Sequence, residues 1–166
     1  MKVRVKLKKL NEKAVLPTKA TSKDFCYDVV AISEKQIAPS VWQYGLGFAY
    51  EIEDHDLKLG IAYDQDGQEV YSMQPADIAI DFRPRSSVWK TGMILSNCEG
   101  TLDELYRGEV MAVFYHVKST MPRYQIGDKI GQIKLGITLP LEFEFVDEIN
   151  MNTDRGTGGF GSTGLR

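Results

Sequence analysis

The sequence predicts an all-β protein, and three observations support this prediction. Apolar residues alternate with polar ones at Val3-Val5-Leu7, at Leu141-Phe143-Phe145 and around Val70-Tyr71, which is the two-residue period of a half-buried strand. No window of helical length carries apolar residues at the i, i+3, i+4 and i+7 positions of an amphipathic helix. Turn sequences such as Asp64-Gln65-Asp66-Gly67 and Gln125-Ile126-Gly127-Asp128 recur at short intervals. Many short strands joined by turns are typical of a sandwich, barrel or jelly roll.

Length and composition predict one globular domain, which we place at residues 1–150. The 166 residues suit a single core, and 43% hydrophobic with 26% charged residues are globular values. A net charge of −3 gives no overall attraction for nucleic acid or an anionic membrane, so we expect no stable nucleic-acid binding and only local binding of phosphate. The apolar stretches fall far short of the roughly 20 residues that span a bilayer, so we expect no membrane contact and a cytoplasmic location.

The residues that commonly bind metals do not form a convincing metal site in this sequence. Cys26 and Cys98 lack CxxC spacing, so we expect two isolated thiols in the core. Asp54-His55-Asp56 is more typical of a solvated loop than of a metal site. His116 lies in an apolar predicted strand, where a structural role is the simpler interpretation.

The C-terminal residues 151–166 form a segment that cannot build a core, because the last twelve contain five glycines. The segment contains the pattern GxGxxG, but no strand precedes it and no helix follows, so a dinucleotide-binding fingerprint is excluded. Glycines still allow successive backbone N–H groups to surround an anion, and Ser162 and Thr163 add hydroxyl donors. Arg155 is suited to a bidentate phosphate contact, and Phe160 to covering a planar base. A frayed terminus is the alternative.

Three further segments carry candidate site residues. In Arg83-Pro84-Arg85-Ser86-Ser87, guanidinium groups and hydroxyls surround a proline, which indicates either a phosphate cradle or an ordinary polar turn. A hairpin within Asn97–Glu109 would present an amide, a carboxylate and an aromatic ring on one rim. Asp128 and Gln132 form a weaker set, for which a turn entering a strand is the alternative.

Taken in order, these segments resemble the five motifs of the trimeric deoxyuridine triphosphatase (dUTPase) family. The matching segments are Thr21–Ala31, Pro84–Ser87, Asn97–Glu109, Gly127–Gln132 and Arg155–Gly164. Five matches in the family's order make coincidence improbable, and the fifth motif is the most specific.

The sequence departs from the family pattern at three places. Leu105 stands where an acidic residue commonly precedes the motif tyrosine, and Phe25-Cys26 replaces the usual Ala-Gly. Between Gly45-Leu46-Gly47 and Pro84 the spacer is longer than the family usually carries, and we interpret about 54–76 as an extra hairpin. None of these changes removes a proposed catalytic group.

The resemblance implies a jelly-roll-like β subunit in a homotrimer, with three sites between subunits and a mobile C-terminal tail that closes over the site of another subunit. It implies an enzyme, a dUTP diphosphatase, that hydrolyses dUTP to dUMP and pyrophosphate by attack of water on the α-phosphorus. This activity limits uracil incorporation into DNA and supplies dUMP for thymidylate synthesis.

The resemblance also implies a role for each candidate residue. Asp103 is the catalytic carboxylate that deprotonates the water. Mg²⁺ is the cofactor, held mainly by the substrate phosphates, with Asp28 acting structurally or through metal-bound water. The expected substrate-binding residues are Arg85, Ser86, Ser87, Asn97, Gly100, Tyr106, Gln132, Arg155, Phe160, Gly161, Ser162 and Thr163.

Two other functions are compatible with the same fold. A dCTP deaminase shares the β-fold and the Arg-Ser-Ser segment, but it needs a proton shuttle at the cytosine ring, and the motif tyrosine and the Phe-bearing tail fit a phosphohydrolase better. A nucleotide-sensing homologue would keep the pocket and act through the extra hairpin, although the presence of Asp103, Gln132 and Arg155 argues against pure binding.

Overall fold

The computed structural model describes residues 3–53, 57–60, 62–63, 66–70 and 74–153, and these residues form an all-β structure. The fold class predicted from the alternating pattern is therefore confirmed. The one helix in the described residues is a short 3-10 turn, η1 (Ser86–Lys90). The strands are β1 (Val5–Lys9), β2 (Tyr27–Val30), β3 (Ser33–Ala38), β4 (Val41–Gly45), β5 (Phe48–Ile52), β6 (Lys58–Leu59), β7 (Ala62–Tyr63), β8 (Glu69–Val70), β9 (Gln74–Pro75), β10 (Asp77–Arg83), β11 (Met93–Leu95), β12 (Gly100–Asp103), β13 (Met111–His116) and β14 (Lys129–Thr138).

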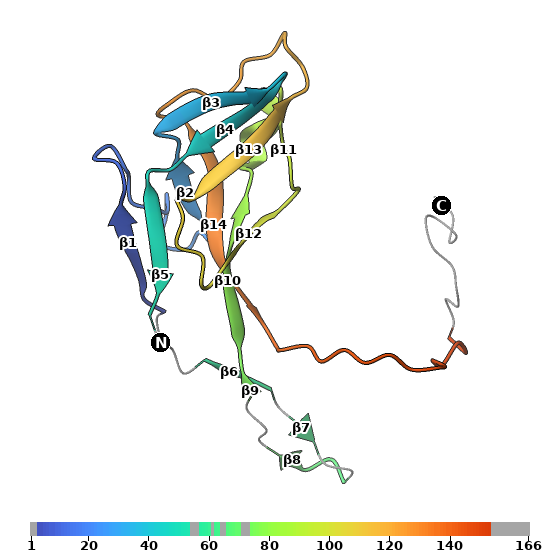
Figure 1. The fold of residues 1–166 in the computed structure, drawn as a ribbon. Coiled ribbons are helices and arrows are strands. Elements are labelled where there is room, and N and C mark those ends of the chain that lie inside the picture. The colour runs from blue at the N-terminus through green and yellow to red at the C-terminus, as the bar shows by residue number, and fades with distance from the viewer. Residues whose placement is uncertain (1–2, 54–56, 61, 64–65, 71–73, 154–166) are drawn as a thin grey trace.

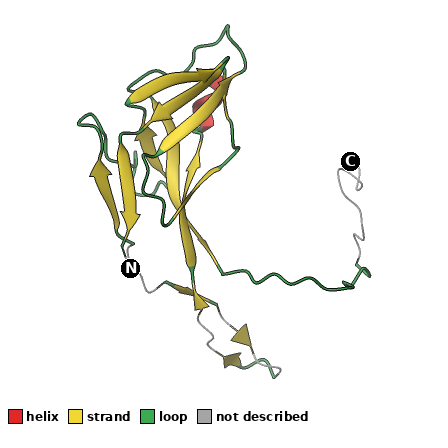
Figure 2. Cartoon of the chain, in the orientation of Figure 1, coloured by secondary structure: helices red, strands yellow, loops and turns green. Residues whose placement is uncertain are grey.

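Two four-stranded antiparallel sheets form the body of the molecule. One has the order β12-β10-β14-β2 and the other β11-β13-β4-β3. The two layers are visible in Figure 1 and, as strands alone, in Figure 2. Strand β10 shows why they pack together, because Ile78, Ile80 and Phe82 are buried and alternate with the less buried Ala79 and Asp81. They meet apolar residues of the facing sheet, such as Phe114 on β13, in one continuous core.

A separate ribbon of β1 and β5 flanks the two sheets, with Val5 opposite Ile52 and Lys9 opposite Phe48. Val5 and Leu7 face an apolar groove of about 640 Å³ between this ribbon and the sheet of β10 and β14. The other face of β1 carries Lys6 and Lys8. The residues lining the groove are Val3, Val5, Leu7, Leu16, Pro17, Tyr27, Phe48, Tyr50, Ile80, Leu102, Val110, Ile133, Lys134 and Leu135.

Two small antiparallel ribbons lie in the region where the sequence predicts an extra hairpin. Strand β6 pairs with β9, and β7 pairs with β8 through Ala62 opposite Val70 and Tyr63 opposite Glu69. Figure 1 shows them as an extension below the two sheets, continuous with the lower end of β10. These ribbons add no strand to either of the two four-stranded sheets.

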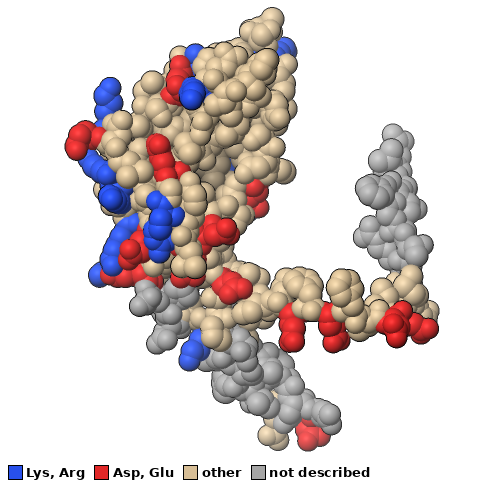
Figure 3. Space-filling model, viewed as in Figure 1, with Lys and Arg blue, Asp and Glu red and all other residues tan. Residues whose placement is uncertain are grey.

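Residues 139–153 leave the body of the molecule as an extended arm (Figure 1). The alternation at Leu141-Phe143-Phe145 predicts a strand, but the arm pairs with no strand among the described residues of its own chain. Leu141, Phe143 and Phe145 are therefore exposed. Figure 3 shows the acidic residues of the arm in a row on one side, while Lys and Arg gather on the body around β1.

Candidate active site

The candidate active site begins at Asp28, a carboxylate on β2 that is only 5% exposed. Its backbone forms two hydrogen bonds with Thr18, so the chain is fixed at this point. Gln132 Nε2 donates to Asp28 Oδ1 at 3.0 Å, and Lys129 Nζ donates to Oδ2 at 3.0 Å. Both donors come from β14, which pairs with β2 with Gln132 directly opposite Asp28. The sheet thereby unites residues of the first and fourth motif segments.

Asp28 is ionised in this environment. Burial alone would raise the pKa of Asp28, but the hydrogen bonds from Lys129 and Gln132 and the charge of Arg85 outweigh it and hold the pKa below its usual value. A carboxylate with both oxygens occupied by donors is suited to orienting Arg85, Lys129 and Gln132. It is less suited to direct coordination of a metal.

Arg85 joins this cluster from the turn that follows β10. It occupies the N-cap position of η1, with Ser86 and Ser87 in the first turn of that helix. Arg85 Nε lies 3.1 Å from Asp28 Oδ1, although the angle between the two groups does not make a hydrogen bond. Two cations thus converge on one carboxylate, which leaves a local positive charge for an anion. Sequence analysis identified Arg85 and Gln132 but missed Lys129, whose only signal was its place between Asp128 and Gln132.

Asp128 has a different role from its neighbours. Its side chain accepts a hydrogen bond from Gln125 N at 2.8 Å and closes the turn that leads into β14. The turn interpretation of this residue is therefore the one that the contacts support.

The second group of candidate residues lies on the hairpin that contains β12. Asn97 is exposed just before β12, and Gly100 begins the strand opposite Phe82. Tyr106 follows in a turn closed by its N–H, which donates to Asp103 O at 2.9 Å, and its hydroxyl donates to Glu109 O at 2.9 Å.

Gly108 lies directly under the ring of Tyr106, which folds back over it. A Cβ atom at this position would lie 2.3 Å from Tyr106 Oη and 2.6 Å from Cζ. A side chain at this position would make the exposed Tyr106 ring shift, so Gly108 leaves room for the position that the ring occupies.

Asp103 ends β12 and is exposed. Its backbone carbonyl accepts a hydrogen bond from the Tyr50 hydroxyl. Burial, with a smaller contribution from Asp103, raises the pKa of Tyr50 to about 12, so the hydroxyl remains a donor. Because this contact uses the backbone oxygen of Asp103, it fixes the strand end and leaves the carboxylate for other chemistry.

One chain does not bring the two groups together. In the sheet order β12-β10-β14-β2, Asp103 and Asp28 lie on opposite edge strands. Asp103 is level with Gly136 of β14, whereas Asp28 is level with Gln132. Three strand spacings across and four residues along place their Cα atoms on the order of 20 Å apart. The cluster around Asp28 and the hairpin around Asp103 therefore lie at separate ends of the sheet in one subunit.

Some of the predicted site residues belong to parts of the chain that the structure does not describe. Arg155, Phe160, Gly161, Ser162 and Thr163 lie outside the described residues, as does Asp54-His55-Asp56.

The prediction of two buried thiols is wrong. Cys98 is exposed and Cys26 only partly covered, because each lies in a loop next to a strand end rather than within a strand. His116 closes β13 and shares a 3.0 Å hydrogen bond with Met121 O, in keeping with a structural role.

Comparison with known proteins identifies the family of this chain. A family model described as dUTPase matches residues 69–164. The deoxyuridine 5'-triphosphate nucleotidohydrolase of Clostridium novyi is 32% identical over 96% of this chain and 97% of its own length. The chain belongs to the dUTPase family. Another dUTPase relative, from Clostridium acetobutylicum, is 31% identical over 99% of both chains.

Solved dUTPases share the fold. The enzyme of Staphylococcus bacteriophage 80alpha, solved with dUpNHpp, superimposes with a TM-score of 0.71 at 17% identity, covering 98% of this chain and 99% of that one. A mutant of the dUTPase from phage phi11 of S. aureus, whose structure shows the coordination of a structural Mg(II) ion, gives a TM-score of 0.62 at 15% identity, covering 89% of this chain and 99% of that one. The described part of this dUTPase-family chain holds no helix with the length and apolar character needed to span a bilayer.

Proposed function

We propose that this dUTPase-family protein hydrolyses dUTP to dUMP and pyrophosphate at sites completed by neighbouring subunits. The observation that carries the proposal is that one subunit has two separate groups of candidate residues. One is the cationic group around Asp28, and the other is the hairpin around Asp103 and Tyr106. The first suits a triphosphate and the second suits a nucleoside. Each chain supplies both halves, but to different sites.

The group around Asp28 is proposed to hold the triphosphate. Arg85 supplies a guanidinium that binds phosphate oxygens in a bidentate manner, and Gln132 an amide donor. The hydroxyls of Ser86 and Ser87 lie on the same turn as Arg85, at the start of η1. Charge neutralisation and alignment supply most of the acceleration in reactions of this type. Asp28 keeps these donors oriented before the substrate arrives.

The hairpin is proposed to hold the deoxyuridine. Asn97 and backbone groups near Gly100 read the uracil edge, and a wall close to C5 excludes the thymine methyl group. Tyr106 lies under the sugar and leaves no room for a 2′-hydroxyl. Rejection of UTP is therefore steric, and it depends on the ring position that Gly108 permits.

Asp103 is the proposed general base. Its carboxylate holds a water molecule and takes its proton as the oxygen attacks the α-phosphorus. The bond between the α-phosphorus and the oxygen that bridges to the β-phosphate then breaks, and pyrophosphate leaves with the bonding electrons. General-base assistance contributes about 10²–10⁴-fold, so it accounts for only part of the acceleration.

Mg²⁺ is proposed to enter with the nucleotide. The described residues contain no cluster of three metal-binding side chains, and the oxygens of Asp28 already accept hydrogen bonds from Gln132 and Lys129. This donor set fits a metal bound chiefly by substrate phosphates, with Asp28 contacting it through water. When bound, the metal neutralises charge on the triphosphate.

A homotrimer is proposed because the family resemblance implies one, and two features of the single subunit support assembly. The first is the distance of about 20 Å between Asp103 and Asp28, which requires one subunit to supply the base to the phosphate group of another. The second is the arm of residues 139–153, whose apolar side chains are exposed on the isolated chain. An exposed segment with this alternation has the pattern of a strand and can pair with the edge of a sheet in another chain.

The β1 edge of a neighbouring subunit fits this arm. Strand β1 pairs only with β5 among the described residues, so its other edge is available for a strand. Leu141 and Phe143 alternate with Glu142, as Val5 and Leu7 alternate with Lys6. One face of the added strand would enter the apolar groove, while its glutamates would meet the lysines of β1. The opposite charges of the arm and β1, and the alternation of apolar residues in both, support exchange of the arm between subunits.

Residues 1–150 are proposed to form the β domain, and residues 151–166 a tail that closes over a site of another subunit. In that closed state Arg155, Ser162 and Thr163 contact the phosphates, the backbone at Gly161 helps to surround them, and Phe160 covers the base. Closure excludes water and completes the phosphate clamp.

The experiment is release of pyrophosphate from dUTP with Mg²⁺, beside dCTP, dTTP and UTP, for the parent chain and for Asp103→Asn. Release from dUTP alone, with a large loss in the variant, is expected. Ammonia release from dCTP would instead identify a deaminase. Binding of dUTP without turnover would identify a nucleotide sensor.

A further inference from the structure

The proposed general base, Asp103, is held in place through its backbone. In the part of the chain that the structure describes, no side chain forms a hydrogen bond or an ion pair with the Asp103 carboxylate. The carbonyl oxygen of Asp103 instead accepts two hydrogen bonds, one from Tyr106 N at 2.9 Å and one from the Tyr50 hydroxyl. These two donors fix the backbone from which the carboxylate extends.

The two donors differ in where they come from. Tyr106 belongs to the turn that Asp103 begins, so it moves together with the residue that it holds. Tyr50 lies on β5, 53 positions away in the chain and outside the sheet of Asp103. Asp103 itself ends β12, an edge strand of that sheet. The Tyr50 hydroxyl therefore attaches the end of an edge strand to a separate element.

Tyr50 is a firm attachment point. It is 2% exposed, and on β5 it stands directly opposite Leu7 of β1. Its ring lines the apolar groove together with Leu102 and Val110, which lie on either side of the turn that carries Asp103. A buried tyrosine needs a partner for its hydroxyl, and here that partner is the Asp103 carbonyl.

Strand β5 and the turn before it also hold the far end of this segment. Gly47 N donates to Glu109 Oε1 at 2.8 Å, and Val110 N donates to Phe48 O at 2.9 Å. These contacts do not involve the phenol. Loss of the Tyr50 hydroxyl would therefore release only the end of the segment that carries the base, while the rest of the segment keeps its place.

We propose that Tyr50 is a positioning residue for Asp103. Its hydroxyl holds the end of β12 at the position from which the Asp103 carboxylate reaches the attacking water, and it acts through the backbone of Asp103 alone. The inference rests on the proposed function, since it takes Asp103 as the general base. Tyr50 lies outside all five motif segments, so the family resemblance gives it no role.

The test compares Tyr50→Phe with the parent protein in pyrophosphate release from dUTP, in binding of the non-hydrolysable analogue dUpNHpp and in melting temperature. The variant keeps the ring in the groove and removes the hydroxyl. We expect kcat to fall roughly 10- to 100-fold, because a small displacement of a reacting group is costly. KM and the affinity for dUpNHpp should stay at the parent values, because the group around Asp28 lies on other strands.

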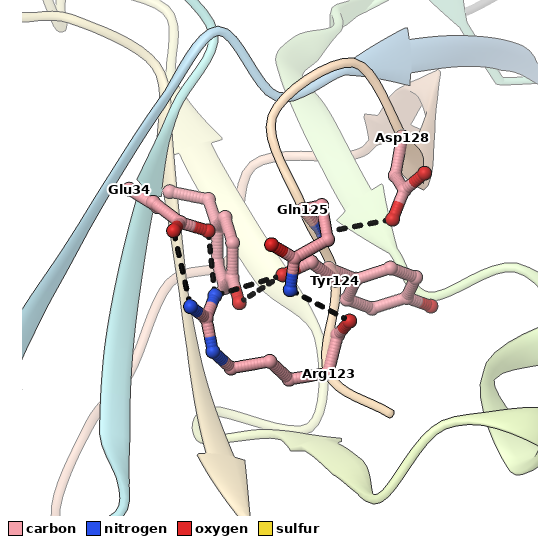
Figure 4. Close-up of polar contacts among 6 residues, drawn as sticks. Glu34, Arg123, Tyr124, Gln125 and Asp128 are labelled. Atoms are coloured by element: carbon pink, nitrogen blue, oxygen red, sulfur yellow. Dashed lines mark hydrogen bonds and ion pairs between the residues drawn. The ribbon is translucent and has the colours of Figure 1, made fainter. Parts of the chain in front are cut away.

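Tyr44→Phe is the matched control, because the Tyr44 hydroxyl is buried and also donates to a backbone carbonyl. Tyr44 Oη donates to Tyr124 O at 2.9 Å, and this carbonyl accepts a second hydrogen bond from Arg123 NH1 at 3.1 Å. Figure 4 shows Tyr124 beside Arg123, which also binds Glu34. Tyr44→Phe should lower the melting temperature about as much as Tyr50→Phe does and leave kcat unchanged. An equal loss of kcat in both variants would overturn the positioning role.

The Asp103→Asn background separates positioning of the base from a general weakening of the site. If Tyr50 acts through the Asp103 carboxylate, Tyr50→Phe should cause no further loss of turnover once that carboxylate is gone. A full additive loss in the double variant would overturn the proposal.

The remaining outcomes separate this inference from the proposed function. Parent kcat in Tyr50→Phe would overturn the positioning role while leaving dUTP hydrolysis intact. Parent turnover in Asp103→Asn would overturn the inference together with the assignment of the base. Failure of the parent protein to release pyrophosphate from dUTP would overturn both the inference and the proposed function.

Discussion

Gln132 Nε2 donates a hydrogen bond to Asp28 Oδ1 at 3.0 Å, although 104 positions separate the two residues in the chain. The contact exists because β14 and β2 are neighbours with these residues directly opposite each other. Lys129 occupies the second oxygen of the same carboxylate. The proposed phosphate-binding half of the site is therefore held together by the pairing of β14 with β2.

Asp28→Asn should destabilise the protein at neutral pH. The expected loss is about 1–2 kcal/mol, below the range for fully buried pairs because Lys129 is 44% exposed. The pKa of Asp28 is lower in the folded state than its unfolded value near 3.9, so its stabilisation is complete above that value and disappears as pH falls through the folded pKa. Thermal melts of both proteins between pH 7 and pH 3 should converge at the acid end. Glu53→Gln, which alters an exposed pair, is the control, and a constant difference at all pH values would contradict the prediction.

Asp103→Asn should lower kcat by about 10²–10⁴-fold without changing the melting temperature. The fold is retained because Tyr50 binds the backbone carbonyl of Asp103, which the substitution leaves in place. Pyrophosphate release and a thermal melt measure the two effects. Asp77→Asn alters another exposed carboxylate of the same sheet and should behave as the parent does. Parent-like turnover in the Asp103 variant would remove Asp103 from the mechanism.

Gly108→Ala should weaken discrimination between dUTP and UTP. The new methyl group would lie 2.3 Å from Tyr106 Oη, so the ring must move from its present position. We expect the ratio of kcat/KM values for dUTP and UTP to fall by about ten-fold or more. Tyr106→Phe keeps the ring and loses only the hydrogen bond to Glu109, so it should retain most of the discrimination. Unchanged selectivity in Gly108→Ala would show that the ring does not set it.

A double substitution in the arm, Phe143→Asp with Phe145→Asp, should abolish assembly and turnover while leaving the subunit folded. Both side chains are exposed on the isolated chain, so the subunit core loses nothing. Sedimentation velocity should show a monomer, and pyrophosphate release should be lost because each site needs two chains. Glu142→Gln changes the polar side of the arm and should remain assembled. An assembled and active double variant would exclude a role for these phenylalanines in the interface.

A chain ending at Asp154 should remain folded and assembled but lose most of its turnover. The deleted residues include the proposed phosphate contacts Arg155, Ser162 and Thr163, and loss of such contacts costs at least about 100-fold in kcat. Phe160→Ala removes only the cover over the base and should have a smaller effect. Equilibrium sedimentation checks assembly, and single-turnover kinetics with dUTP check the chemical step. Near-normal turnover would refute the role of the tail.

Local pattern was enough to predict much of this protein. The alternation of Val3, Val5 and Leu7 predicted β1, and the absence of helical periodicity predicted an all-β fold. These features depend on residues close together in the chain, where side-chain period and turn chemistry act directly. The ordered motifs likewise indicated Arg85, Asp103 and Gln132, because motif spacing is a property of the chain alone.

Other features were not predictable from local pattern. Lys129 was missed, because a lysine at the start of a strand carries no signal of what it approaches across the sheet. The exposure of Cys98 was also missed, because burial depends on which loop covers a residue. The same alternation that predicted β1 predicted a strand at Leu141-Phe143-Phe145, which has no partner within its own chain.

The amino-acid sequence by itself determined the strand-rich fold, the turn positions and the identity of the chemical groups, since these follow from periodicity, backbone preference and side-chain type. Only the tertiary structure decided which groups meet, as Asp28 meets Gln132 and Lys129. It also decided which groups stay apart, because pairing across a sheet is set by strand order, and that order placed Asp103 and Asp28 on opposite edges. Strand order emerges from the packing of the whole chain, which no short segment encodes.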